Sequence, residues 1–273
     1  MTDTTASSDT EFRYHAGFEY PAWDFEVTAE TQARKLACCD IDPAIYGDRV
    51  DITHYALATV LSAKRAGLPV NGRVHMTQRF IQNEQIVLGE TLTVRGEDIK
   101  VVPDRRGQIV TSRFEFVRPD GSIPLRAERS SLVLDATLAE KAQPSAAKSK
   151  PAADPTEGMI KIGEKQLVPE KVAAYSDEAE NLIHSDPETA QRFGFRAPIA
   201  AGLMAIRFMM EALSKEAVPQ QLDLQIRFRR PMFWDEKLDI WGRHDSDGKL
   251  THIAIVNQDG KLANDGVIDR VEY

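Results

Sequence analysis

A single histidine, His184, stands just before a predicted helix start. Asp186 followed by Pro187 is typical of a helix N-cap with proline in the first turn. We expect this helix to run through Ala190 and to end near Gly194. His184 therefore lies on a constrained turn, where an imidazole can orient a water molecule and handle a proton.

The start of a second predicted helix offers a complementary group. This helix, at residues 200–213, is strongly apolar and follows Pro198, so its first free backbone N–H groups fall near Ala201 and Gly202. Amide donors and the helix dipole both favour a developing oxyanion at such a position. Gly202 lets a carbonyl group approach closely, where a side chain would obstruct it.

The spacing of these groups resembles a known motif, which is carried by Asn181-Leu182-Ile183-His184, Asp186, Ala190, Gly194-Phe195, Pro198-Ile199-Ala200 and Gly202. The string is similar to the hydratase-2 motif of MaoC-like enzymes. The resemblance implies a hydro-lyase that reversibly hydrates a trans-2-enoyl thioester to the (R)-3-hydroxyacyl thioester. It implies an acyl-CoA or acyl-carrier thioester substrate, catalytic roles for His184, Asn181 and Gly202, and no metal or organic cofactor.

The sequence departs from the family pattern where the catalytic carboxylate is expected. Counting back from His184 puts Ala179 in the usual Asp position, and Ala201 replaces the His that precedes the family's glycine. If Tyr175 is matched to the family's aromatic residue instead, Glu180 occupies the carboxylate position. We therefore predict Glu180 as the base. Two neighbouring acids remain as substitutes, namely Asp177 and Glu178.

The substrate-binding groups are predicted around the second helix and one strand. Pro198 and Ala201 flank the helix start, and the string RFRRP at 227–231 resembles the family's arginine-bearing strand. Arg227 and Arg229 are candidates for binding CoA phosphates, although a structural role fits them equally well. Strand alternation directs Arg229 away from Arg230, so these arginines are not all expected to contact one ligand.

Two blocks of the chain resemble each other. The stretch 78–94 matches 226–240, and 114–125 matches 253–264, where each member of the second pair contains an Asp-Gly turn. An apolar helix precedes the strands in each block, at residues 52–67 and 200–213. The pattern predicts an α+β fold in which each antiparallel sheet wraps round a central apolar helix, with the two sheets continuing each other.

Together with the resemblance, this repeat predicts a double hot-dog protein. The predicted parts are a disordered tail at 1–15, an N-terminal hot-dog domain at 16–135, a linker at 136–160 rich in Ala, Pro, Ser and Lys, and a C-terminal domain at 161–273. In two-domain relatives the N-terminal domain has lost the motif and shapes the acyl pocket, while the C-terminal domain catalyses. Homodimerisation remains open.

Composition limits the other classes of function. A net charge of −8 argues against broad nucleic-acid binding, and no apolar run approaches the length of a membrane span. The adjacent pair Cys38 and Cys39 matches neither a disulfide framework nor a metal site, so we expect a cytoplasmic protein. His54, His75 and His252 have no setting comparable to His184 and are predicted to be surface or core residues.

Two alternatives to the hydratase follow from the missing aspartate, and unusual lyase chemistry on branched or dicarboxylic CoA esters stays open beside them. One is a hot-dog thioesterase that uses Glu180 as base or nucleophile. The other is a non-catalytic acyl-CoA-binding protein, for which Ala179 and Ala201 are the motive. Turnover of an enoyl thioester identifies the hydratase, release of free CoA identifies the thioesterase, and binding without turnover identifies the acyl-CoA-binding protein.

Overall fold

A computed structural model describes residues 14–69, 73–135 and 154–273 of the chain. The described elements of the first half are β1 (Phe18–Glu26), α1 (Ala29–Ala37), η1 (Pro43–Ile45), α2 (Thr53–Arg65), β2 (Arg73–Gln82), β3 (Thr91–Asp104), β4 (Gly107–Val117) and β5 (Leu125–Leu134). Those of the second half are β6 (Ile160–Gln166), α4 (Pro169–Tyr175), η2 (Asp177–Ala179), η3 (Leu182–His184), α5 (Pro187–Arg192), α6 (Gly202–Leu213), β7 (Gln221–Phe228), β8 (Lys237–His244), β9 (Leu250–Asn257) and β10 (Leu262–Glu272). The predicted tail at 1–15 and linker at 136–160 lie mostly outside the described residues.

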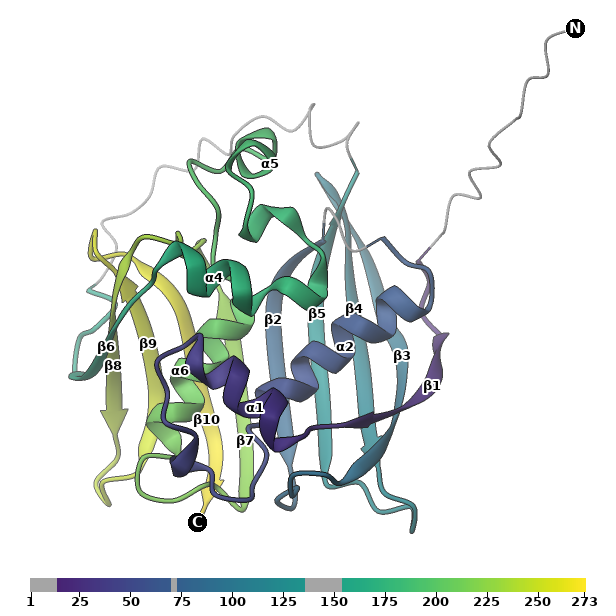
Figure 1. The fold of residues 1–273 in the computed structure, drawn as a ribbon, viewed down its shortest axis with the longest axis horizontal. Helices are drawn as coiled ribbons and strands as arrows, with labels where there is room; N and C mark the ends of the chain where they lie inside the picture. The colour runs from purple at the N-terminus through teal and green to yellow at the C-terminus, as the bar shows by residue number, and fades with distance from the viewer. Residues whose placement is uncertain (1–13, 70–72, 136–153) are drawn as a thin grey trace, which may run out of the picture.

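The described strands form one antiparallel sheet in the order β1-β3-β4-β5-β2-β7-β10-β9-β8-β6. Its two halves join where β2 pairs with β7, and there Phe80 lies opposite Leu224 (Figure 1). These two strands begin the matching stretches 78–94 and 226–240, so equivalent strands of the repeat meet at the centre of the sheet. The prediction that the halves continue each other's sheet is confirmed.

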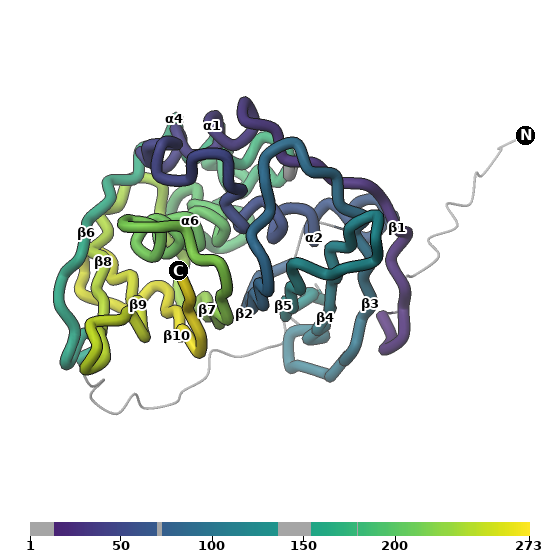
Figure 2. Tube along the Cα trace, turned by 90° about the horizontal axis from the view of Figure 1, so that it is seen from below, coloured from purple at the N-terminus to yellow at the C-terminus, as the bar shows by residue number. Residues whose placement is uncertain are grey.

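Each half of the sheet curves round one apolar helix, as seen end-on in Figure 2. Both helices were predicted, and α2 ends before Gly67, whose positive φ of 75° suits a helix stop. In α6 the methionines at 204, 209 and 210 are all buried. The predicted α+β double hot-dog fold, two sheets each wrapped round a central apolar helix, is confirmed.

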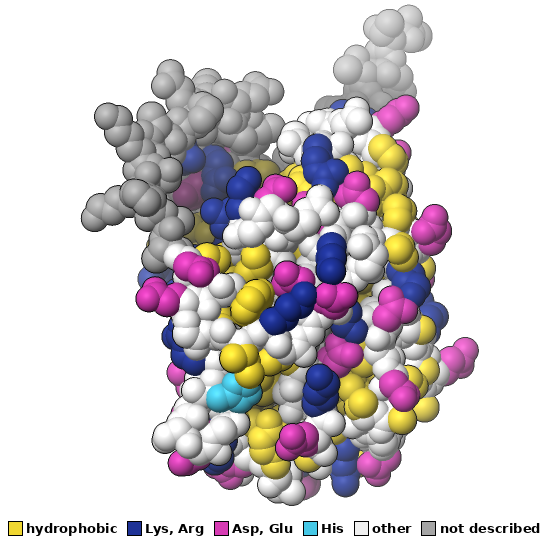
Figure 3. Space-filling model, turned by 90° about the vertical axis from the view of Figure 1, so that its left-hand side faces the viewer, with side chains coloured by type: hydrophobic (Ala, Val, Ile, Leu, Met, Phe, Trp, Pro, Cys, Tyr) yellow, Lys and Arg dark blue, Asp and Glu magenta, His cyan; other side chains and the backbone are white. Residues whose placement is uncertain are grey.

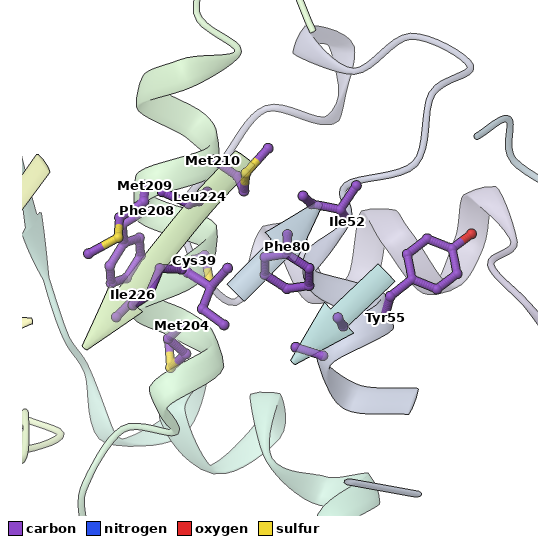
Figure 4. Packing of buried hydrophobic residues seen from close by; sticks show 14 of the residues in the cluster. Cys39, Ile52, Tyr55, Phe80, Met204, Phe208, Met209, Met210, Leu224 and Ile226 are labelled. Carbon is purple, nitrogen blue, oxygen red and sulfur yellow. The ribbon is translucent and has the colours of Figure 1, made fainter. Parts of the chain in front are cut away.

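The core runs without interruption from one half to the other. Phe80 of β2 and Leu224 of β7 are both fully buried, and the side chains of Ile52, Met204 and Met210 extend the same cluster (Figure 4). Burial of a side chain of this size contributes about 1.5–3 kcal/mol. The two halves therefore share one hydrophobic core cluster.

The predicted Asp-Gly hairpins are also present. Gly121 lies in the turn between β4 and β5, and Gly260 lies in the turn between β9 and β10, both with positive φ. Positively and negatively charged side chains are interspersed on the surface over the second half (Figure 3). None of the helices in the described residues has the length and apolar content that crossing a bilayer requires.

Candidate active site

A cavity of about 310 Å³ lies between the two halves and is lined by residues from both. The second half contributes His184, Gly202 and Phe228, and the first half contributes Leu57, His75 and Arg129. Most of the lining is apolar, and the polar groups are few. A mostly apolar concave site with a small number of polar groups is the usual form of a small-molecule site.

His184 is held at this cavity by its backbone and by its ring. Asn181 begins the short helix η3, where its Oδ1 atom accepts a hydrogen bond from Ile183 N at 3.4 Å. The His184 ring bonds through Nδ1 to the carbonyl oxygen of Ile199 at 2.7 Å. Because a carbonyl only accepts, Nδ1 carries the proton, and Nε2 is left as an acceptor. Burial lowers the pKa of His184, which outweighs the opposing effect of the Ile199 carbonyl, so the ring is neutral at pH 7.

The helix after His184 forms as predicted. The Asp186 side chain caps α5 by accepting a hydrogen bond from Thr189 N at 2.9 Å, and Pro187 occupies the first turn. The amide of Asp186 itself bonds to Leu182 O at 2.8 Å. These bonds close the chain into a compact turn on both sides of His184, which fixes the imidazole.

The segment before α6 connects His184 to the helix start. Ile199 N donates to Ile183 O at 3.1 Å, and Ala200 N donates to Met232 O at 2.8 Å. No side chain caps α6, and no described residue accepts a hydrogen bond from the Gly202 amide. The structure thus brings His184, Asn181, Ala201 and Gly202 to one cavity, and the amide at its wall retains an unused donor.

The structure brings only one of the two candidate acids, Glu178 and Glu180, to the cavity. Glu180 has a left-handed backbone with φ of 51°, its side chain is 73% exposed and pairs with Lys64 at 2.8 Å, and it is not among the cavity-lining residues. Glu178 does line the cavity. Its carboxylate pairs with Arg34 and lies 3.4 Å from the Nζ atom of Lys35, two cations of helix α1. The acid that the structure brings to the cavity is therefore Glu178, because the left-handed turn carries Glu180 outward.

Only some of the predicted substrate-binding residues lie at the cavity. Ala201 and Arg229 line the cavity, whereas Pro198 and Arg227 do not. Arg227 follows the buried Ile226 on β7 and points to the opposite, exposed face. Arg230 lines the cavity together with Arg229, and their side chains bind different partners, Leu262 O and Asp265. The strand ends at Phe228, so strand alternation does not extend to them.

Three polar residues of the first half were missed. Arg73, His75 and Arg129, from β2 and β5, also line the cavity. His75 was expected to be an ordinary surface or core residue, yet its ring lies against that of Phe228, with ring centroids 4.5 Å apart. A signal for Arg129 was present in the sequence, because it alternates in phase with the buried residues Leu125 and Ala127. A charged residue at an inward strand position is unusual and marks a special environment.

Among the described residues there is no group of three or more His, Cys, Asp or Glu side chains that could hold a metal ion. The polar groups at the cavity instead include two imidazoles, one carboxylate, an amide donor and several guanidinium groups. This set can activate water, stabilise an oxyanion and bind anions.

No protein-family model matches the sequence, and no curated protein matches it. The structure, however, is similar to solved structures over nearly its whole length. HtdX from Mycobacterium tuberculosis has 18% sequence identity and a TM-score of 0.72, covering 90% of this chain and 98% of HtdX. A MaoC-like dehydratase from Phytophthora capsici has 16% identity and a TM-score of 0.68, covering 93% of this chain and 96% of the dehydratase. An acyl-ACP thioesterase from Bacteroides thetaiotaomicron has 10% identity and a TM-score of 0.57, covering 92% of this chain and 97% of the thioesterase.

These similarities establish the class of protein by its fold. The chain has the double hot-dog fold of MaoC-like dehydratases, so the predicted resemblance is confirmed at that level. The thioesterase has a related fold, which means that the fold does not by itself choose the reaction.

Proposed function

We propose that this protein is a MaoC-like hydro-lyase that interconverts a trans-2-enoyl thioester and its (R)-3-hydroxyacyl thioester. One observation carries the proposal: the fixed imidazole of His184 and the unused amide of Gly202 line the same largely apolar cavity. A reacting thioester needs both groups at once. The acyl carrier is CoA or an acyl-carrier protein.

The start of α6 supplies the electrostatic part of the mechanism. When water adds to the β-carbon, negative charge moves onto the thioester oxygen. An oxygen placed at the Gly202 amide accepts its hydrogen bond and meets the positive end of the helix dipole. Both groups are already oriented, so little reorganisation is needed during the reaction.

The attacking water lies between the imidazole and a carboxylate in this proposal. Neutral His184 orients the water by accepting a hydrogen bond at Nε2. Glu178 accepts the proton released as the C–O bond forms, and returns it to the α-carbon on the same face of the acyl chain. Its ion pairs with Arg34 and Lys35 hold the carboxylate in place. Glu178 takes the role that the sequence pattern favoured for Glu180.

Hydration of crotonyl-CoA, followed as loss of the conjugated thioester absorbance, tests the proposal. We expect His184→Ala and Glu178→Gln each to lower kcat/KM by about 100-fold or more. His252→Ala and Glu180→Gln are the matched controls, since neither residue lines the cavity. Full activity in His184→Ala, or a larger loss in Glu180→Gln than in Glu178→Gln, would overturn the assignment.

A thioesterase is the second candidate, and the structural likeness to an acyl-ACP thioesterase favours it. In that case Glu178 would act on the thioester carbonyl or on water, and saturated acyl-CoA would be hydrolysed. Release of free CoA from hexanoyl-CoA, measured with a thiol reagent, distinguishes hydrolysis from hydration. Binding of acyl-CoA with neither reaction would identify a non-catalytic acyl-binding protein.

A further inference from the structure

A row of polar side chains crosses the inner face of the first half's sheet. Asp98 on β3 lies opposite Ser112 on β4, and Ser112 lies opposite Arg129 on β5. All three are buried at positions that otherwise carry core residues. Tyr20 and Ser112 both donate to one oxygen of Asp98, at 2.7 and 2.6 Å. The row reaches the cavity at Arg129.

The cavity end of this row has more hydrogen-bond donors than acceptors. Arg129 is 5% exposed, and within the described part of the chain its hydrogen bonds go to two hydroxyl groups, those of Thr59 at 3.3 Å and Ser131 at 2.9 Å. Further nitrogen atoms here are shielded from solvent and have no hydrogen-bond partner among the described residues. They are Nε of Arg129, Nε and one terminal nitrogen of Arg73, and Nε2 of His75. Four nitrogen atoms at one wall of the cavity therefore remain unused.

The positive charges at this wall also outnumber the negative ones. The guanidinium groups of Arg73 and Arg129 share one buried carboxylate, that of Asp98, which attracts Arg129 but has one oxygen without a hydrogen-bond partner among the described residues. Burial, with Arg73 close by, lowers the pKa of Arg129 to about 9, so Arg129 is still cationic at neutral pH. Burial of a cation without a paired anion is costly, and a protein retains such a group where a ligand supplies the counter-charge.

This wall lies close to the proposed oxyanion site. A Cβ atom on Gly202 would lie 3.0 Å from the Phe228 ring, and His75 also lies against that ring, at 4.5 Å between centroids. The start of α6 and the wall with the unused donors thus adjoin the same aromatic ring. A ligand held by its thioester at Gly202 needs only a short chain to reach them.

We propose that Arg73 and Arg129, beside His75, bind a carboxylate at the far end of the acyl chain, so that the preferred substrate is the monothioester of a short dicarboxylic acid. This inference rests on the proposed function for the position of the thioester. Guanidinium groups bind a carboxylate through charge-assisted hydrogen bonds.

A CoA phosphate is the other anion to consider. Phosphates of CoA are heavily hydrated and multiply charged, so they suit a solvent-facing surface. Arg129 is buried on the inner face of the sheet, where it lines the cavity. Arg229, whose side chain is 40% exposed, is better placed for a phosphate. The experiment below separates these two sources of negative charge.

Paired substrates that differ only at the chain end test the inference. trans-2-Hexenedioyl-CoA carries a terminal carboxylate where trans-2-hexenoyl-CoA carries a methyl group. We expect wild-type protein to favour the carboxylate substrate in kcat/KM by at least about 10-fold, from charged hydrogen bonds formed in a buried site. Arg129→Met removes the charge at similar volume and is expected to abolish this preference while retaining hexenoyl-CoA turnover.

The control variant is Arg126→Met on the same strand, because Arg126 faces outward and pairs with Glu115. It should keep the preference. If Arg129→Met fails to fold by circular dichroism, Arg73→Met tests the same wall. Calorimetric binding of the saturated pair, adipyl-CoA and hexanoyl-CoA, gives a readout without turnover.

The outcomes separate this inference from the proposed function. If neither enoyl substrate is hydrated but adipyl-CoA binds at least about 10-fold tighter than hexanoyl-CoA, the carboxylate site stands and the hydratase proposal fails. Equal binding of the two saturated esters overturns the carboxylate site. If Arg129→Met weakens the binding of adipyl-CoA and hexanoyl-CoA equally, the carboxylate site is also overturned, and the anion that Arg129 binds is a phosphate of CoA.

Discussion

The two central helices begin in opposite ways, although they occupy equivalent positions in the repeat. At the start of α2, the side chain of the N-cap residue Ile52 makes no hydrogen bond, but Asp51 before it accepts hydrogen bonds from the amide and the hydroxyl of Thr53, at 2.9 and 2.7 Å. At the start of α6 no described side chain accepts from the first amide, and Gly202 lines the cavity. A satisfied amide at a helix N-terminus contributes stability, whereas one that is left open can bind a ligand.

The same acid ties the first helix to the second. The other carboxylate oxygen of Asp51 pairs with Arg207 of α6, which also donates to the Tyr175 hydroxyl at 2.9 Å and to His54 Nε2 at 3.2 Å. The side chains of Asp51 and Arg207 are almost fully buried. The first half thus uses its helix start to bind the second half, whereas the helix start of the second half lines the cavity and is the group to which we assign the thioester oxygen.

The largest expected effect comes from breaking the closed helix start. Asp51→Ala removes the acceptor of the Thr53 amide and leaves Arg207 buried without its counter-charge. We expect the free energy of unfolding to fall by about 3–5 kcal/mol, measured by urea denaturation. The double variant Asp51→Asn/Arg207→Met should recover part of the loss. A decrease below about 1 kcal/mol in Asp51→Ala would mean that the pair does not hold the halves together.

The open helix start is tested by Gly202→Ala. The added methyl group would lie 3.0 Å from the Phe228 ring, within the space that the thioester oxygen is proposed to occupy. We expect kcat/KM to fall by about 10- to 100-fold, with little change in Tm. Gly163→Ala is a suitable control, since its methyl group would meet Ile240 at an ordinary 3.8 Å. Unchanged activity in Gly202→Ala would remove the amide from the mechanism.

Acid should weaken both halves through their buried histidines. Burial lowers the pKa of His54, with Arg207 as a further cause, and burial lowers that of His184. The unfolded chain therefore binds more protons than the folded one once the pH falls below about 6.5, and stability declines from there downward. Each histidine contributes a slope of up to about 1.4 kcal/mol per pH unit. Urea denaturation between pH 7.5 and 5.5 should show a shallower decline in His54→Gln, and an identical slope would contradict this.

The smallest effect is expected at the ion pair between Lys64 of α2 and Glu180. Both side chains are largely exposed, at 42% and 73%. We expect Lys64→Ala to change the free energy of unfolding by less than about 1 kcal/mol and to leave kcat unchanged. A large loss of activity in Lys64→Ala would return Glu180 to consideration as the base.

Local sequence patterns predicted those parts of the site whose geometry is fixed by hydrogen bonds between residues close together in the sequence. His184 and the start of α6 follow from caps and spacing, and they are joined by short-range hydrogen bonds such as that from Ile199 N to Ile183 O. The choice between Glu178 and Glu180 depended on the direction of one turn. The left-handed conformation of Glu180, a residue other than glycine, has no clear signature in the sequence.

The first half's contribution to the site required the sheet topology. His75 and Arg129 are far from His184 in sequence and reach the cavity only because β2 pairs with both β5 and β7. Composition does not reveal such an arrangement. The inward-facing position of Arg129 on β5 indicated a special environment. Its neighbours could be identified only from the pairing of the strands.

The pairing of β2 with β7 has a consequence for how such a chain can diverge. A symmetric dimer of one hot-dog unit would make the same contact between two identical strands, and every substitution would then appear on both sides of the seam. Covalent fusion removes that coupling, because each copy mutates alone. One copy is then free to specialise in selecting ligands while the other conserves the reacting groups, without any loss of the shared sheet.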